Sequence, residues 1–194
     1  MGTITRIAML GALASASALP AGCSSVGDAL QEARENSGAN PAPCPNAFAL
    51  DEAARMVVFD GEPALSNVAW SAEVTDVRTS CRYTADNPID AQVEMDFAVG
   101  RGPAAEGRTF DVTYFVAVTR RDKDLIAKRE FTVPVTVRDG RATAALTERV
   151  RDIVIPRLDE NTSGTNFEIA VGFALSREQL LYNRSGRSLK FPEL

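Results

Sequence analysis

Histidine is absent from this chain of 194 residues. Because histidine is the commonest general base at neutral pH and the commonest metal ligand, its absence excludes Ser-His-Asp and Cys-His nucleophilic sites in their usual form. It also excludes zinc sites that contain histidine. Glycine-rich phosphate motifs and the Ser-x-x-Lys spacing are missing as well. The sequence therefore predicts a protein that is not an enzyme, with no catalytic residues, no metal ligands and no cofactor.

Basic residues are in the minority, and long apolar runs are confined to the N-terminus. The chain has 21 Lys and Arg against 26 Asp and Glu, which gives a formal net charge of -5. Nucleic acid is not expected as a partner, because its recognition needs a concentrated positive face. The length and a hydrophobic content of 45 % predict one domain with processed or tethering ends.

Residues 1–22 have the build of a secretory signal peptide. Arg6 precedes an apolar stretch over 7–19, and small residues follow that stretch. The stretch is shorter than the ~20 residues that span a bilayer, so a retained transmembrane helix is not expected.

The end of this segment, Leu19-Pro20-Ala21-Gly22-Cys23, resembles the lipobox of bacterial lipoproteins. Ala21 and Gly22 fit that motif, whereas Pro20 stands where the motif usually has an aliphatic residue. The resemblance implies that the Cys23 sulfur carries diacylglycerol and that its new amino group receives a fatty acid such as palmitate.

This lipid anchor would hold the protein in the cell envelope. By the same resemblance, Ser24 rather than Asp after the cysteine implies the outer membrane, facing the periplasm, with the inner membrane as the alternative. The competing interpretation is ordinary cleavage after residues 16–18, which leaves no lipid anchor.

The two remaining cysteines are expected to pair. If Cys23 is lipidated, Cys44 and Cys81 form an even pair in an oxidising compartment, and a disulfide follows. Closing the loop between them would stabilise the fold by ~4 kcal/mol. Two unconnected buried thiols are the alternative.

The domain is predicted to cover 44–184, after a lipidated N-terminus and flexible tether over 23–43 and before a frayed tail over 185–194. Alternating apolar and polar residues predict about seven strands in an antiparallel, immunoglobulin-like or fibronectin III-like β-sandwich, which is an all-β fold. The predicted strands are 54–59, 68–75, 93–99, 110–118, 131–137, 142–146 and 167–175.

Three residue types refine this expectation. Pro134 confines its strand to an edge or a bulge. Trp70 is expected in the core near the disulfide, as in immunoglobulin domains. Ser176 and Gln179 have the spacing of a capping box, which predicts a two-turn helix that lays Leu180, Leu181 and Tyr182 against one open end of the sandwich.

Several short motifs are distributed along the predicted domain: Cys44-Pro45, Ser80-Cys81-Arg82-Tyr83, the segment 102–108, the segment 114–118 and the segment 172–175. Together they resemble a group of proteobacterial lipoproteins to which no activity is assigned. The resemblance covers Cys44 to about Arg184 and implies an envelope location and this architecture.

The loop over 101–108 is the candidate partner-binding site. Arg101, Glu106 and Arg108 on this Gly/Pro/Ala-rich segment would present a rigid basic fork to an acidic polymer or a protein carboxylate. The alternative is a hairpin connection whose arginines only solvate its ends. The acidic segments 86–90 and 159–162 raise the question of calcium, but Asx residues beside Pro or Gly are ordinary turn formers.

Three functions remain open from the sequence. The first is a non-enzymatic, lipid-anchored envelope module that binds another envelope protein or polymer through a sheet face or the strand edge near Pro134. The second is a hydrolase or carbohydrate-active enzyme that uses two carboxylates on the sandwich loops. The third is a structural spacer.

Overall fold

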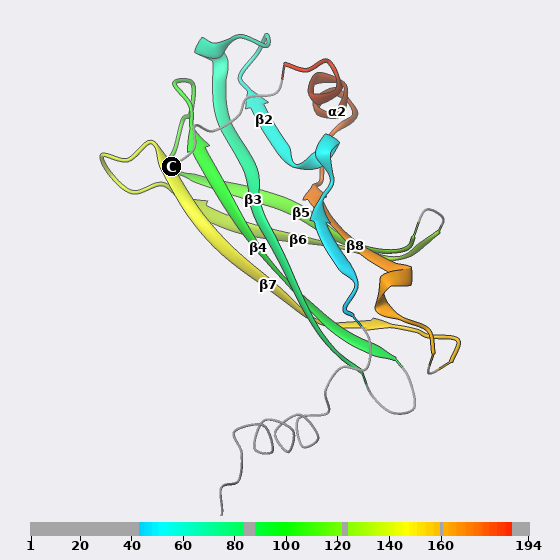
Figure 1. Cartoon of the computed structure of the whole chain (residues 1–194). Helices are drawn as coiled ribbons and strands as arrows, with labels where there is room; N and C mark the ends of the chain where they lie inside the picture. Colours follow the sequence, from blue (N-terminus) through cyan, green and yellow to red (C-terminus); the bar gives the residue numbers. More distant parts are fainter. Residues whose placement is uncertain (1–42, 84–87, 122–123, 160, 188–194) are drawn as a thin grey trace, which may run out of the picture. The chain divides into compact units, whose positions relative to one another are not determined.

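The computed structural model describes residues 43–83, 88–121, 124–159 and 161–187. In this part the chain is an all-β sandwich of eight strands in two four-stranded sheets, with one short α-helix (Figure 1). The predicted signal peptide, Cys23, nearly all of the predicted tether and most of the predicted tail lie outside the described residues.

Each sheet combines consecutive strands with one or two that come from elsewhere in the chain. One sheet has the order β1 (Asn46–Ala49), β8 (Phe167–Phe173), β5 (Thr109–Arg120), β6 (Leu125–Thr136). The other has the order β2 (Arg55–Phe59), β3 (Val68–Tyr83), β4 (Ile89–Arg101), β7 (Thr143–Ile155). The short elements are η1 (Asp51–Ala53), η2 (Leu65–Asn67), η3 (Gly164–Asn166) and α2 (Arg177–Arg184).

The connections give the sandwich its topology. β3 and β4 form a hairpin in one sheet, β5 and β6 form a hairpin in the other, and the chain then crosses twice to set β7 beside β4 and β8 beside β5. An immunoglobulin fold arranges its A, B, E, C and F strands in this way. The strand that would follow beside F is replaced here by β1, which pairs parallel to β8.

Alternation along the strands produces the core. On β4, the side chains of Val93, Met95 and Phe97 are at most 1 % exposed, while Glu94 and Asp96 between them reach the outer face. All seven predicted strands are present, because each has enough apolar residues at period 2 to cover the inner face of its sheet.

Two strands differ from the sequence-based expectation. β1 was not predicted, since four residues are too few to establish a period. β7 extends nine residues beyond the predicted end at 146. This part was not predicted because a bulge near Asp152, whose φ is 59°, interrupts the alternation, so that the inward positions after Val150 are Ile153 and Ile155.

β3 runs the length of the sandwich and defines its two ends. Its first residue, Val68, lies at the end that also holds α2, which we call the groove end. Cys81, near its other terminus, bonds to Cys44, and we call this the disulfide end. The sequence separation of 13 between Val68 and Cys81 corresponds to about 40 Å of extended chain.

The placement of Trp70 corrects one expectation. Trp70 is a core residue, 7 % exposed, but its ring stacks on Phe110 with 5.3 Å between centroids at the groove end. It therefore lies roughly 35 Å along β3 from Cys81, not beside the disulfide. The error came from the immunoglobulin pattern, in which the tryptophan and the cystine share the centre of the core.

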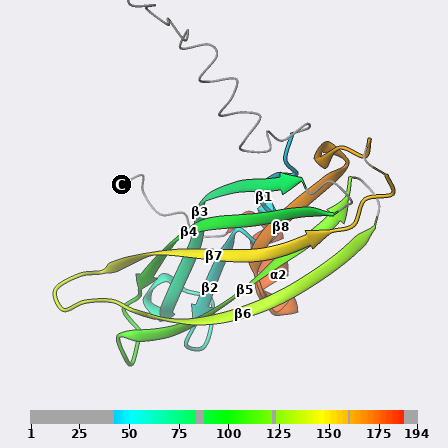
Figure 2. The same ribbon diagram turned by 90° about the horizontal axis from the view of Figure 1, so that it is seen from below.

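The two sides of the sandwich are closed differently. On one side the continuous segment β1-η1-β2 passes from one sheet to the other. On the other side, which we call the open side, β6 and β7 are both edge strands of their sheets. Figure 2 shows β7 as the last strand of the layer that holds β3 and β4. Pro134 on β6 confirms the predicted edge position.

The C-terminal helix has the predicted cap but a different neighbour. Ser176 Oγ accepts from the Gln179 backbone N–H, and the Gln179 side chain accepts from the Ser176 N–H, which completes the capping box. α2 lies beside β2 and η1 instead of across an open end of the sandwich, because Tyr182 packs edge-on against Phe59. Leu181 stays 53 % exposed.

Candidate functional site

The predicted loop over 101–108 lies at the groove end and crosses from β4 in one sheet to β5 in the other. It is thus not the hairpin connection that the sequence offered as the alternative. Its backbone is anchored to the start of β3, where the Gly102 N–H donates to Ala69 O at 2.8 Å and the Ala104 N–H donates to Val68 O at 3.0 Å. A Cβ on Gly102 would lie 2.0 Å from Val68 O, so only glycine fits there.

Both arginines of this loop are turned onto main-chain carbonyls. Arg101 donates to Gly107 O at 2.7 Å and to Ala105 O at 2.8 Å, which closes the loop on itself. Arg108 donates to Val137 O at 3.0 Å and to Arg138 O, and it forms an ion pair with Asp139 at 3.0 Å. Glu106 is exposed, and among the described residues no ion pair joins it to either guanidinium group. Arg101 therefore stabilises the conformation of the loop, and Arg108 links the start of β5 to the segment after β6.

A larger feature at the same end is a groove between β2 and α2, with a volume of 730 Å³. We call it the β2–α2 groove. Its apolar lining includes Val58, Phe59, Leu181 and Tyr182, and charged residues such as Glu62, Glu178 and Arg187 stand around them. A lining that combines apolar and charged side chains is found at protein and peptide interfaces. In the described part of the chain it is more spacious than the hollow of 450 Å³ beside Phe115 and the one of 330 Å³ beside Phe167.

Two side-chain amides on α2 hold one wall of the β2–α2 groove in place. Asn183 Nδ2 donates to Arg55 O at 2.7 Å and to Glu52 O at 2.9 Å, and Gln179 Nε2 donates to Val57 O at 3.2 Å. Being four residues apart, the two amides project from one face of the helix and substitute for the strand that β2 lacks on this side. The edge of β2 is therefore covered, and the helix is fixed beside it.

The ends of α2 add an ion pair and a cation–ring contact. Arg184 donates to Glu52 Oε2 at 2.7 Å, and this hydrogen bond lowers the pKa of the Glu52 carboxyl below its usual value. The Arg187 guanidinium lies over the Tyr182 ring, 5.3 Å from its centroid. Gly186 in the left-handed region, with φ of 74°, turns the chain back toward that ring.

Sequence reasoning did not identify the β2–α2 groove. Its signal was present, because the predicted helix carried three consecutive apolar residues at 180–182, more than one helix face can bury. The sequence did not indicate that β2 would be the neighbour of this helix, because the strand and the helix are more than a hundred residues apart.

At the disulfide end, a hydrogen-bonded tyrosine and the disulfide together hold residues 43 and 44 against the sandwich. The Tyr83 hydroxyl donates to Pro43 O at 2.6 Å and accepts from the Gly164 N–H at 2.7 Å. A Cβ on Gly164 would lie 2.4 Å from Pro43 O. The Cys44–Cys81 bond, with 5.6 Å between the Cα atoms, and this hydroxyl bridge thus tie residues 43 and 44 to β3 and to η3.

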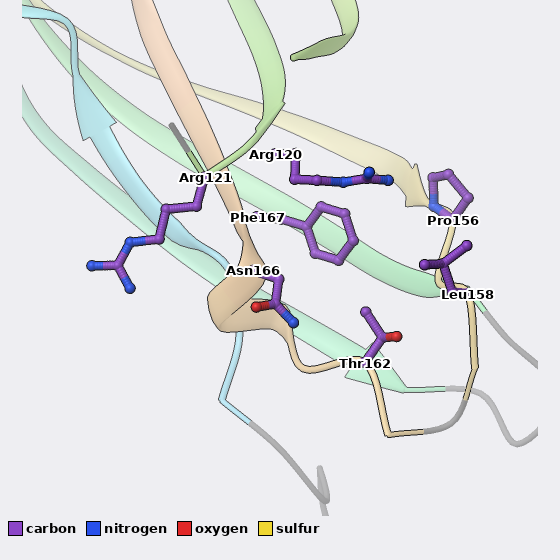
Figure 3. A pocket seen from close by; sticks show the side chains of 7 residues that line it. All are labelled: Arg120, Arg121, Pro156, Leu158, Thr162, Asn166 and Phe167. Atoms are coloured by element: carbon purple, nitrogen blue, oxygen red, sulfur yellow. The ribbon is translucent and has the colours of Figure 1, made fainter. Parts of the chain in front are cut away.

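A cavity of 330 Å³ also lies at the disulfide end, where β5 and β7 finish and β8 begins. Figure 3 shows the Phe167 ring at its centre, with Arg120 alongside the ring and Pro156 and Leu158 beyond it. Arg121 points away from this group in the same view. Phe167 is buried, whereas Leu158 is 85 % exposed.

The acidic residues of the chain are distributed over turns and an outer sheet face. Asp159 Oδ1 accepts from the Asn161 N–H at 2.9 Å and from the Thr162 hydroxyl at 3.1 Å, which is an Asx turn. Of the segment 86–90, positions 86 and 87 lie outside the described residues. Within the described part, no group of three or more Cys, Asp or Glu side chains is arranged to hold a metal ion.

On the outer face of β3, β4 and β7, carboxylates are paired with arginines. Arg78 donates to Glu94 and to Asp96, each at 2.8 Å, and Arg149 also reaches Glu94. The Arg78 hydrogen bond, followed by one from Thr147 at 2.6 Å, lowers the pKa of the Asp96 carboxyl. A general acid needs a raised pKa, so the Asp96 carboxyl is shifted in the opposite direction.

Comparison of the chain with protein-family models, with curated proteins and with solved structures found no match. Among the described residues, no helix has the length and apolar character needed to cross a membrane.

Proposed function

We propose that this chain is a non-enzymatic binding module of the bacterial cell envelope, held at a membrane by acyl chains on Cys23. In this proposal the β2–α2 groove receives another envelope protein or polymer. The lipobox resemblance at residues 19–23 and the oxidised Cys44–Cys81 pair both support export from the cytoplasm.

The observation that carries the proposal is the position of the groove relative to the disulfide. Residues 43 and 44 are fastened at one end of the sandwich, and the β2–α2 groove opens at the other end, about 40 Å away along β3. A module anchored through its N-terminus would therefore present the groove away from its anchor.

The fastening at the disulfide end suits a tethered protein. Tension on the tether would pass through Cys44 into Cys81 on β3, which pairs with β4 over nearly its whole length. The four residue pairs between β1 and β8 would carry little of this load. The disulfide and the Tyr83 bridge thus protect the weakest strand from being peeled away.

The chemistry of the groove favours a partner that offers apolar groups flanked by charges. The rings of Phe59 and Tyr182 and the exposed Leu181 would lose water on binding, at about 25 cal/mol for each Å² of apolar surface covered. Glu62 and Arg187 would then fix orientation at the rim.

The test is site-specific photo-crosslinking in the native envelope, followed by mass spectrometry. A photoreactive residue replaces Leu181 in the groove or, as the matched control, Leu65, which is 72 % exposed but does not line it. We expect one reproducible product from position 181 that is absent from position 65 and is lost on Tyr182→Ala. No product from 181, or the same product from both positions, would contradict a groove partner and favour a spacer.

A further inference from the structure

The disulfide end carries an unusual share of the exposed aliphatic side chains. Of the six large hydrophobic residues that are exposed in the described part, three lie there: Leu125 at 61 %, Val154 at 63 % and Leu158 at 85 %. The register places Leu125 and Val154 at this end, since Leu125 pairs with Thr119 near the end of β5 and Val154 pairs with Asp90 near the start of β4. The two side chains flank the end on the outer faces of the two sheets, and Leu158 follows β7 in the sequence. Exposed apolar residues collected at one end indicate a contact surface.

A cationic group stands beside these side chains. Arg120 lines the same cavity as Leu158, and Figure 3 shows its side chain extended toward Pro156. In the described part of the chain, no ion pair or side-chain hydrogen bond joins its guanidinium to another residue. The nearby Asp159 carboxylate already accepts two hydrogen bonds within its own turn.

We propose that the disulfide end docks on the membrane surface, with Leu125, Val154 and Leu158 entering the headgroup boundary and Arg120 meeting a lipid phosphate. This inference rests on the proposed lipid anchor at Cys23. The 20 residues from 24 to 43 can span at most about 70 Å, and they join the sandwich at this same end. The disulfide end is therefore the part of the domain that is kept nearest to the bilayer.

The combination of residues matches the chemistry of an interface. Aliphatic side chains gain by leaving water for the boundary of the acyl region, while an arginine extends its apolar stem and keeps its charge at the phosphate level. The carboxylates of Asp124 and Asp159 lie at the same end, so the charge attraction is modest and the aliphatic residues supply most of the affinity.

Because the domain would be tethered to the membrane, a weak contact with the lipid surface is sufficient for docking. A short linker holds its module at an effective concentration in the millimolar range near the surface, so docking that would be negligible for a free protein becomes populated. Docking by this end would also set the orientation of the domain, because the long axis along β3 then points the β2–α2 groove away from the lipid.

The experiment uses the full chain expressed in a bacterium, recovered from the membrane fraction and reconstituted in vesicles. Hydrogen exchange is measured at residues 124–126 and 156–159, and residues 62–66 at the groove end serve as the internal reference. One set of vesicles contains phosphatidylglycerol, and the other contains phosphatidylcholine alone. We compare the unmodified chain with the double variant Leu125→Ser with Leu158→Ser.

Docking predicts that exchange at the disulfide end is slower by roughly tenfold in the unmodified chain than in the double variant on phosphatidylglycerol vesicles. Leu65→Ser, an exposed leucine at the opposite end, should behave as the unmodified chain. Arg120→Ala should remove the difference between the two vesicle types, whereas Arg141→Ala, an exposed arginine before the start of β7 at the groove end, should keep it.

Equal exchange in the unmodified chain and the double variant would overturn the proposal. Protection by inorganic phosphate in the absence of vesicles would also overturn it, since the cavity would then be a site for free phosphate. The mass of the N-terminal peptide in the same sample reports separately whether Cys23 is lipidated, so failure of the anchor and failure of docking are told apart.

Discussion

The Tyr114 hydroxyl donates a hydrogen bond to the Glu148 carboxylate, with 3.3 Å between the two oxygens. Tyr114 is a core residue of β5, 1 % exposed, and Glu148 occupies an inward-facing position on the edge strand β7, opposite Met95. A carboxylate that points inward from an edge strand discourages the addition of a further strand. Burial first, and then the negative charge of Glu148, raise the pKa of the Tyr114 phenol well above its usual value.

This pair predicts a loss of stability at alkaline pH. Above pH ~10 the unfolded chain releases the phenolic proton while the folded chain retains it, so unfolding becomes easier as pH rises. We expect the free energy of unfolding to fall by up to about 1 kcal/mol per pH unit, because water near the open side between β6 and β7 weakens the effect. Urea unfolding at a series of pH values measures it.

The control for this prediction is Tyr114→Phe. The variant should be less stable than the parent at neutral pH, because Glu148 loses its partner. Its stability should nevertheless decline less steeply above pH ~10. Parallel curves for the two proteins would show that the decline has another source.

Two glycines of the same loop should respond differently to alanine. Gly102→Ala forces a Cβ to within 2.0 Å of Val68 O, and the crossover must move away from β3, whereas a Cβ on Gly107 meets nothing within 4 Å. We expect Gly102→Ala to destabilise the domain by about 2 kcal/mol or more and Gly107→Ala to change it by less than about 0.5 kcal/mol. Thermal and urea unfolding of the pair decide this, and equal effects would show that the close approach is relieved without cost.

The sequence predicted the parts of the fold that follow from local period. Strands such as 93–99 and the Ser176 capping box needed no knowledge of distant residues, and Pro134 marked an edge because it lacks an N–H. The disulfide followed from counting cysteines. The alternation, the capping box and the proline are local patterns, so they can be identified from a single sequence.

The site could not be predicted in the same way, because it depends on contacts between distant segments. Asn183 caps carbonyls of residues 52 and 55, and no local pattern links that amide to β2. Arg101 and Arg108 depend on distant contacts in the same way. The sequence offered either a basic fork or a connecting loop at these residues, and the crossing of the loop between sheets brings main-chain carbonyls within reach of both guanidinium groups.

Arg108 is therefore expected to contribute to stability. Its guanidinium joins the start of β5 to Val137 and Asp139 after β6, so Arg108→Ala leaves the Val137 carbonyl without this donor. We expect a loss of about 1–3 kcal/mol in the free energy of unfolding, and a change of less than about 0.5 kcal/mol for Glu106→Ala in the exposed part of the same loop. A fully stable Arg108→Ala protein would return this arginine to the list of partner-binding candidates.

Removal of the disulfide should destabilise the domain without changing its fold. The double variant Cys44→Ser with Cys81→Ser restores the chain entropy of a segment with a sequence separation of 37, which predicts a loss of about 4 kcal/mol. Because Cys44 lies two residues before the start of β1, exchange of the β8 amides next to β1 should rise more than exchange in β4. Equal increases in both strands would mean that the bond acts only through the unfolded chain.

Pro134 should limit association through the open side of the sandwich. β6 is an edge strand of 12 residues, and a residue without an N–H interrupts the row of groups that another strand would need. Pro134→Thr supplies that donor and fits the outward face, where Thr132 and Thr136 flank it. We expect the variant to fold with a stability near that of the parent but to form dimers or larger species at lower protein concentration, measured by sedimentation velocity. Pro156→Thr is the matched control, because it adds an N–H beyond the end of β7, where no edge strand continues. If the Pro134→Thr protein stays as monomeric as this control, the proline is not needed to limit association. The inward-facing Glu148 and the bulge at Asp152 would then protect the open side by themselves.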